Sequence, residues 1–215
     1  MDIATAVITC PQRERTLLPQ TLASIRRAGF PEPLVRCDNA NLGPLPHWHA
    51  TAVEVFYRNR FADRLIIFQD DILCVRNLAE YLNRCEYPTD GYWNLATIHS
   101  NVHAAKRAGT RWFAGRPSGL GALGLVFDNK CLRTLLGSPG LLDWATDPDA
   151  PRRYPRYVDG GIATTLAKAG YTQYCHNPSL LKHTGTTSAA RPHKTWKDDL
   201  NALFPGEDFD ALSLL

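Results

Sequence analysis

Two adjacent acidic residues, Asp70 and Asp71, follow an apolar run at residues 65–68, with Gln69 between the run and the pair. Adjacent carboxylates repel each other, so a pair that directly follows a buried strand is typical of a divalent-cation site. Oxygen ligands from such acids, together with phosphate oxygens of a bound ligand, suit Mg²⁺ or Mn²⁺. The alternative is a solvated turn at the strand end, in which Asp71 caps a neighbouring element.

Two further residues have types and positions that suit chemistry at such a site. His183 follows an apolar stretch and precedes Gly185 and small hydroxyl residues, so it is a candidate metal ligand. Asp159 precedes two glycines at the start of a predicted helix, where it would act as a general base or as an N-cap. For His183 the alternative is a surface or hydrogen-bonded histidine without a ligand.

Two loops carry weaker signals. The segment TCPQRER, at residues 9–15, holds Arg13 and Arg15, which would bind a diphosphate or form a solvated charged loop. The segment GLGALG, at residues 119–124, precedes a strand instead of joining a strand to a helix, so it is no dinucleotide fingerprint. We expect it to line the site, because glycine lets the backbone approach a ligand closely.

Short apolar runs alternate with amphipathic segments along most of the chain, and we interpret them as strands and helices. Asn77 and Asn129 are expected to cap the helices that follow them. The predicted strands are residues 3–9, 33–37, 65–68, 92–98, 122–127 and 171–175, and the predicted helices are residues 16–28, 48–60, 77–85, 129–136 and 160–170.

This alternation predicts an α/β fold with a mostly parallel central sheet and helices on both faces. A length of 215 residues suits one such domain. Ligands bind outside the carboxyl ends of the strands in sheets of this kind. Arg13, Asp38 and the acidic pair each follow a different predicted strand, so we expect them to meet at one edge.

The composition excludes several classes of protein. Hydrophobic residues make up 44% and charged residues 21%, which excludes a disordered or fibrous chain. No apolar run approaches the roughly 20 residues that cross a bilayer, and the N-terminus lacks the basic start of a secretory signal. We therefore expect no membrane insertion. The six cysteines form no CxxC pair, and without a secretory signal we expect them to be reduced thiols in a cytoplasmic protein.

Charge is distributed unevenly. Residues 198–215 carry five acids and neither Lys nor Arg, and we interpret them as an acidic C-terminal tail beside a domain of residues 1–197. The domain has 24 basic and 16 acidic residues, a net charge of +8, although the whole chain has +3. A basic domain favours an anionic ligand or partner.

Taken in order, these segments resemble the GT-A glycosyltransferases, enzymes with one Rossmann-like domain that use nucleotide-sugar donors. The opening ITCPQRERTLLPQTLASIRRAGF resembles their first strand, nucleotide-binding loop and helix. FQDDIL resembles their metal-binding acidic motif, with Gln69 in place of its first acid. GALGLVF resembles the strand that borders the donor sugar, and PSLLKHTG resembles the C-terminal histidine motif. The resemblance covers about residues 3–188.

The resemblance implies transfer of a sugar from a nucleotide-diphosphate sugar, with Mn²⁺ or Mg²⁺ as cofactor. A UDP-sugar is the donor that we expect. Asp71 and His183 match the metal ligands, and Asp159 matches the base of inverting, family 2-like members. Retention of configuration stays open. The residues that match donor contacts, or adjoin them, are Thr9, Pro11, Arg13, Arg15, Asp38, Gln69, Asp70, Gly121 and Gly124.

The acceptor is indicated only by charge and aromatic content. Residues 101–157 carry nine basic and four acidic residues with interleaved aromatics, which suits a nucleic-acid backbone and an extruded base. We therefore expect DNA as partner, with a hydroxymethylated base of phage type as acceptor; solvated or donor-binding arginines are the alternative. The candidate acceptor residues are Trp112, Arg152, Arg153, Tyr157, Lys194 and Trp196.

Other functions remain open at this stage. A saccharide- or protein-directed glycosyltransferase would use the same donor site. A nucleotidyltransferase also uses a metal and a nucleotide donor. The replacement at Gln69 leaves open a non-catalytic module that binds a nucleotide sugar or a nucleic acid.

Overall fold

The computed structural model describes residues 1–98, 101–117, 119, 121–141, 143, 158–185, 187–188, 191–195 and 201–215, with backbone alone for 187–188 and 191–195. None of the helices in these ranges combines the length and apolar character that crossing a bilayer requires. All six cysteines carry free thiols.

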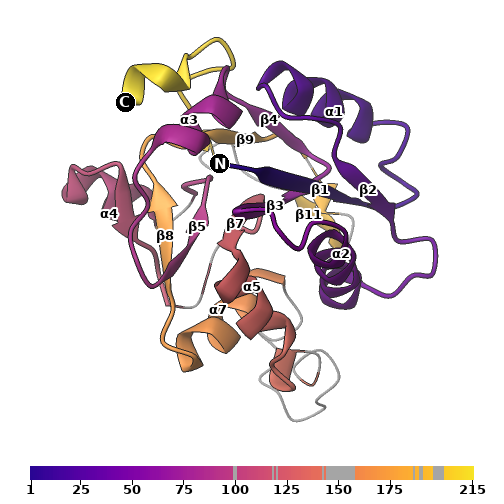
Figure 1. Ribbon diagram of the computed structural model, residues 1–215. Helices are drawn as coiled ribbons and strands as arrows, with labels where there is room; N and C mark the ends of the chain where they lie inside the picture. Colours follow the sequence, from indigo (N-terminus) through magenta and orange to yellow (C-terminus); the bar gives the residue numbers. More distant parts are fainter. Residues whose placement is uncertain are drawn as a thin grey trace.

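A seven-stranded sheet forms the centre of the molecule (Figure 1). Only β7 and β6 run antiparallel to their neighbours, so five of the seven strands point the same way. The predicted α/β class with a mostly parallel sheet is confirmed. In spatial order the strands are β2 (Leu34–Cys37), β1 (Ile3–Thr9), β3 (Arg64–Gln69), β7 (Gly124–Asp128), β5 (Gly91–Asn94), β8 (Thr172–His176) and β6 (Trp112–Ala114).

Helices cover both faces of this sheet, as the alternating apolar pattern predicts (Figure 1). Along β3, Ile66 and Phe68 point into one core, while Leu65 and Ile67 point into the other. A strand with two buried faces needs a helical layer on each side. The first core lies under α1 (Leu18–Arg27) and α3 (Leu78–Arg84), the second under α2 (Pro44–Arg58), α5 (Asn129–Leu136) and α7 (Val158–Lys168), and α4 (Asn101–Ala108) contacts β6.

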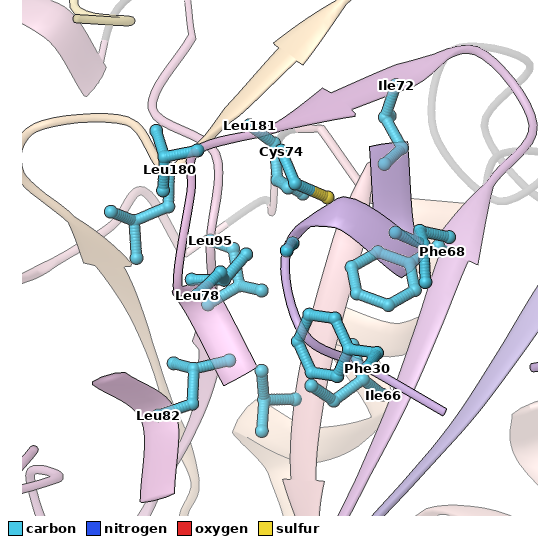
Figure 2. Packing of buried hydrophobic residues seen from close by; sticks show 14 of the residues in the cluster. Phe30, Ile66, Phe68, Ile72, Cys74, Leu78, Leu82, Leu95, Leu180 and Leu181 are labelled. Carbon is cyan, nitrogen blue, oxygen red and sulfur yellow. The ribbon is translucent and has the colours of Figure 1, made fainter. Parts of the chain in front are cut away.

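Two small antiparallel pairs complete the described fold. β4 (Ile72–Cys74) pairs with β9 (Leu181–His183), and β10 (Thr187–Ser188) pairs with β11 (Arg191–Thr195). Figure 2 shows Cys74 and Leu181 within the first core, which also holds Phe30 and Phe68, whose rings meet edge to face at 5.7 Å. This apolar packing fixes β9, and with it the residues at its end.

Several element boundaries differ from the sequence expectation. The strand expected at 92–98 ends at Asn94, whose side chain accepts a hydrogen bond from Ala96 N and so turns the chain. Asn77 has a left-handed backbone and donates to Asp210 instead of capping α3. Asp128, not Asn129, caps α5, because its carboxylate accepts a hydrogen bond from Cys131 N at 2.6 Å.

The C-terminal segment packs against the domain over its described part, residues 201–215. Ala211, in the short helix η2 (Ala211–Leu214), is fully buried in the first core. Asp210 accepts a hydrogen bond from Asn77 at 3.0 Å and pairs with Arg76 at 3.4 Å. Two of the segment's acids, Asp210 and Glu207, therefore neutralise basic groups of the domain, the second through an ion pair with Arg27.

We expect Gly124→Ala to lower stability by about 1–3 kcal/mol, as overpacking in a core commonly does. A Cβ at Gly124 would lie 2.4 Å from Leu181 Cδ1 and 3.0 Å from Phe68 Cδ1, and both side chains are buried with little room to move. The free energy of unfolding in urea is compared between wild type, Gly124→Ala and the control variant Val35→Ala, which changes a partly exposed position on β2. Unchanged stability of Gly124→Ala would contradict the packing role.

Candidate active site

The register of the parallel strands brings distant residues to one edge of the sheet. Ile8 on β1 pairs with Gln69 on β3, so the residues after both strands lie side by side. Asp38 follows β2 at the same edge, where its backbone N donates to Thr9 O at 3.0 Å. The first loop, Asp38 and the acidic pair thus meet as the sequence predicts.

Asp70 lies at the end of β3 with only 5% of its side chain exposed. Its Oδ2 accepts a 2.6 Å hydrogen bond from Thr9 Oγ1, and its Oδ1 accepts one from Arg13 Nη1 at 2.9 Å. Burial raises the pKa of this carboxyl above its ordinary value, against the effect of the hydrogen bond from Thr9. The neighbouring charge of Asp71 adds to the increase.

Asp71 is buried even more completely, with 1% of its side chain exposed. Its Oδ2 accepts a 2.6 Å hydrogen bond from Arg13 Nη1 and lies 3.1 Å from His183 Nε2. Burial alone would raise the pKa of Asp71, but His183 and Arg13 outweigh it and hold that pKa below its ordinary value. Its Oδ1 is buried without a hydrogen-bond partner among the described residues.

His183 reaches Asp71 because β9 pairs with β4, which continues the chain directly after the acidic pair. Ile72 lies opposite His183 in this ladder, and Thr184 N donates to Asp71 O at 2.8 Å. Asn201 holds the backbone of His183 from the other side, accepting from its N at 2.8 Å and donating to its O at 2.9 Å. The predicted association of His183 with Asp71 is therefore a direct contact in the fold.

Two small residues complete this environment. A Cβ at Gly185 would lie 2.5 Å from Asp71 Oδ2, so only glycine leaves room beside the carboxylate. Thr21, buried on α1, donates to Asp70 O at 2.8 Å and accepts from Ile72 N at 3.1 Å. Thr21 and Asn201 were not predicted, because no local pattern marks a side chain that binds a remote backbone.

Asp159 lies at the same edge of the sheet, beside the end of β5 and apart from the acidic pair. Its Oδ2 accepts a 3.1 Å hydrogen bond from Gly121 N, and its Oδ1 accepts one from Gly160 N at 3.0 Å. Asn94, at the end of β5, donates to Gly121 O at 2.9 Å, so the backbone N–H and C=O of Gly121 both have hydrogen-bond partners. Burial raises the pKa of Asp159, although the two glycine N–H groups oppose the shift.

The glycine-rich segment runs between Asp159 and the acidic pair, along the same edge of the sheet. Leu123 O accepts a hydrogen bond from Gln69 N at 2.9 Å, directly beside the acidic pair. Gly121 has a φ of 75°, a conformation that favours glycine, and Gly124 is required by core packing. The segment therefore borders the edge, as expected, through its backbone.

Other predicted site residues have structural partners or lie elsewhere. Both carboxylate oxygens of Asp38 accept backbone N–H groups, from Leu42 at 2.8 Å and Gly43 at 3.0 Å. Pro11 and Arg15 are exposed on the first loop. The ring of Trp112 stacks on Tyr87 at 5.7 Å and meets His176 edge to face at 4.6 Å. Arg152, Arg153, Tyr157 and Trp196 lie outside the described residues, and Lys194 is described by its backbone alone, on β11.

The described side chains offer two ligands for a divalent cation, Asp71 and His183; no group of three His, Cys, Asp or Glu residues that would hold a metal occurs among them. The buried, unpaired Oδ1 of Asp71 and the space kept by Gly185 fit such an ion. An ion with two protein ligands would take its other oxygens from a bound phosphate ligand or water.

Comparison with known proteins adds a likeness of fold. No protein-family model and no curated protein sequence matches the chain. The crystal structure of A197 from STIV is similar, with a TM-score of 0.50 and 12% identity over 96% of this chain and 95% of that chain. A nucleotidyl transferase from Methanothermobacter thermautotroptrophicus (Mth528) aligns with a TM-score of 0.46 and 12% identity, covering 81% of this chain and 86% of that one. Mouse xyloside xylosyltransferase 1, in its apo form, aligns with a TM-score of 0.43 and 9% identity, covering 79% and 82%.

We expect the carboxyl of Asp159 to titrate above the ordinary aspartate value of 3.8. A raised pKa means that the folded state favours the protonated form, so this group lowers stability as the pH rises through its pKa. Carboxyl ¹³C NMR titration, with Asp159→Asn to assign the signal, measures the value. A pKa of 3.8 or less would show that the Gly121 and Gly160 N–H groups outweigh burial.

Proposed function

We propose that the protein is a glycosyltransferase that transfers a sugar from a nucleotide-diphosphate sugar, most simply a UDP-sugar, to an acceptor hydroxyl. The observation that carries this proposal is the buried Asp70–Asp71 pair at the sheet edge. Arg13 binds both carboxylates, and His183 contacts that of Asp71. An anionic diphosphate needs positive charge, and a cation on Asp71 needs acidic ligands. Both needs are met at the carboxyl ends of the strands, where α/β proteins bind nucleotides.

The donor would bind across the first loop and the acidic pair. Arg13 has the forked guanidinium that suits phosphate oxygens, and Thr9 fixes the orientation of Asp70. Asp71 and His183 would hold a Mn²⁺ or Mg²⁺ ion, which when bound acts as a Lewis acid on the departing diphosphate. Glycine at position 185 leaves the space beside Asp71 Oδ2 and His183 free of a side chain, since a Cβ there would lie 2.5 Å from that oxygen.

The transfer step requires removal of a proton from the acceptor. The acceptor oxygen attacks the anomeric carbon as the bond to the phosphate oxygen breaks, and the nucleoside diphosphate leaves with the electron pair. Asp159 accepts the hydroxyl proton, and its raised pKa brings its basicity closer to the working pH. One displacement from the opposite face inverts the anomeric configuration.

The favoured acceptor is a hydroxymethylated base in DNA, in a cytoplasmic setting. Its support is the net charge of +8 in residues 1–197 and the basic, aromatic-rich segments of the sequence. Strong salt dependence of DNA binding would follow from the release of counterions. A saccharide or protein hydroxyl is the competing acceptor.

We expect Asp71→Asn to abolish turnover of the donor, because it removes the charge that would hold the metal. The assay scores release of UDP, GDP or CMP from a panel of donor sugars, with Mn²⁺ and with chelator. Full activity of Asp71→Asn in excess chelator would contradict the metal-dependent mechanism. Turnover of nucleoside triphosphates without turnover of sugar donors would favour a nucleotidyltransferase, and ligand binding without any turnover would favour a binding module.

We expect Asp159→Asn to reduce transfer by roughly 10²–10⁴-fold while donor binding survives, as loss of a general base does. The asparagine keeps the size of the side chain and an acceptor for Gly121 N. Transfer rates with hydroxymethylated DNA and with saccharide acceptors are measured beside donor affinity and a melting curve. Loss of the fold in this variant would indicate a structural role for the carboxylate. Transfer to saccharides alone would exclude the DNA acceptor.

A further inference from the structure

A single nitrogen atom occupies the position between the two buried carboxylates. Arg13 Nη1 lies 2.9 Å from Asp70 Oδ1 and 2.6 Å from Asp71 Oδ2. The same Oδ2 of Asp71 lies 3.1 Å from His183 Nε2. The guanidinium of Arg13 therefore binds the same oxygen, Asp71 Oδ2, that contacts His183, the other proposed metal ligand.

A divalent cation and this guanidinium cannot share Asp71 without strong repulsion. The four side chains are largely withdrawn from water, with exposed fractions of 1% for Asp71, 5% for Asp70, 9% for His183 and 14% for Arg13. Water screens charges weakly in such an environment, so two cations on the two oxygens of one carboxylate repel each other strongly. Arg13 keeps its positive charge, because a guanidinium does not lose its proton in proteins.

A bound diphosphate would offer the guanidinium of Arg13 an alternative partner to the two carboxylates. Arg13 belongs to the loop directly after β1, and it is the most exposed of the four side chains. Asp70 would keep its hydrogen bond from Thr9 if Arg13 left. A diphosphate supplies acceptors that match the guanidinium at least as well as carboxylates do.

We infer that Arg13 serves as the counter-ion of Asp71 in the donor-free protein, and that it must leave Asp71 for the divalent cation to bind. This inference rests on the proposed donor site. The cation alone therefore binds weakly, because it must displace an internal positive charge. A nucleoside diphosphate that attracts Arg13 frees Asp71, so each ligand strengthens the binding of the other by the same factor.

The test is titration with Mn²⁺, followed by the electron paramagnetic resonance signal of the free ion. Wild type, Arg13→Gln, Arg13→Lys and Arg26→Gln are each measured without nucleotide and with UDP. Arg26 is an exposed arginine of α1 that pairs with Glu32, so Arg26→Gln controls for the loss of one positive charge. Asp71→Asn is measured as well, and the Mn²⁺ binding that this variant loses is assigned to the carboxylate of Asp71.

We expect Arg13→Gln to bind Mn²⁺ alone on the order of tenfold more tightly than wild type, a typical coupling between sites. UDP should strengthen Mn²⁺ binding by a larger factor in wild type and in Arg26→Gln than in Arg13→Gln, after subtraction of the Mn²⁺ that UDP binds without protein. Arg13→Lys keeps the charge and should stay close to wild type in the absence of UDP. If Arg13→Gln binds Mn²⁺ no more tightly than wild type, or if Arg13→Lys gains as much as Arg13→Gln, the inference is wrong.

The outcomes separate this inference from the proposed function. Mn²⁺ binding that depends on Asp71 but not on Arg13 would overturn the inference and leave the proposed metal site intact. Failure of wild type and every variant to bind Mn²⁺, even with UDP, would overturn both. Should Arg13→Gln fail to fold, the side-chain ¹⁵N signal of Arg13 in wild type gives the answer. It should shift when Mg²⁺ and UDP bind together, and a signal that stays unchanged would contradict the exchange.

Discussion

Two adjacent carboxylates that are almost wholly withdrawn from water impose the main constraint on this structure. A buried carboxylate is tolerated only with compensating charge or hydrogen bonds, and a neighbouring carboxylate makes the requirement stricter. Asp70 and Asp71 receive this compensation from Thr9 and Arg13, at the end of β1 and in the loop after it, and from His183, far along the chain. The fold around the pair can be understood as the means of delivering these partners.

The sheet topology delivers them in a simple way. Parallel pairing of β1 with β3 places the first loop beside the acidic pair, and antiparallel pairing of β4 with β9 returns the chain to Asp71. Strand β7 runs the opposite way, so the glycine-rich segment that precedes it lies at this edge too. Asn94 and Asp159 bind the backbone C=O and N–H of Gly121, which fixes the glycine-rich segment beside Asp159.

The sequence predicted those features that depend on local pattern. An apolar run followed by acids defined β3 and its polar end, and the same kind of pattern defined β1 and most helices. His183 was a candidate metal ligand from its residue type and surroundings, and the family resemblance paired it with Asp71; no spacing in the sequence indicates their contact. The short helix α4 was missed because its buried side chains, Asn101, Val102 and Ala105, give little apolar periodicity.

The individual hydrogen bonds between residues far apart in the chain could not be predicted. Nothing near Arg13 in the sequence indicates that one of its nitrogen atoms joins both acids, or that Asn201 holds the backbone of His183. Trp112 was interpreted as an acceptor contact because it is an aromatic residue in a basic segment, and this stays a prediction. Its ring packs on Tyr87 and His176, contacts that depend on the pairing of β6 with β8 and on the packing of the first core and that no local pattern indicates.

A crystal structure of the protein with UDP and Mn²⁺, with the ion located by its anomalous scattering, tests the proposed site most directly. The ion should contact Asp71 and His183, and the diphosphate should lie on the ion with Arg13 turned toward it. An ion or a nucleotide bound away from the Asp70–Asp71 pair, with Arg13 still joining the two acids, would contradict the assignment of this edge as the donor site.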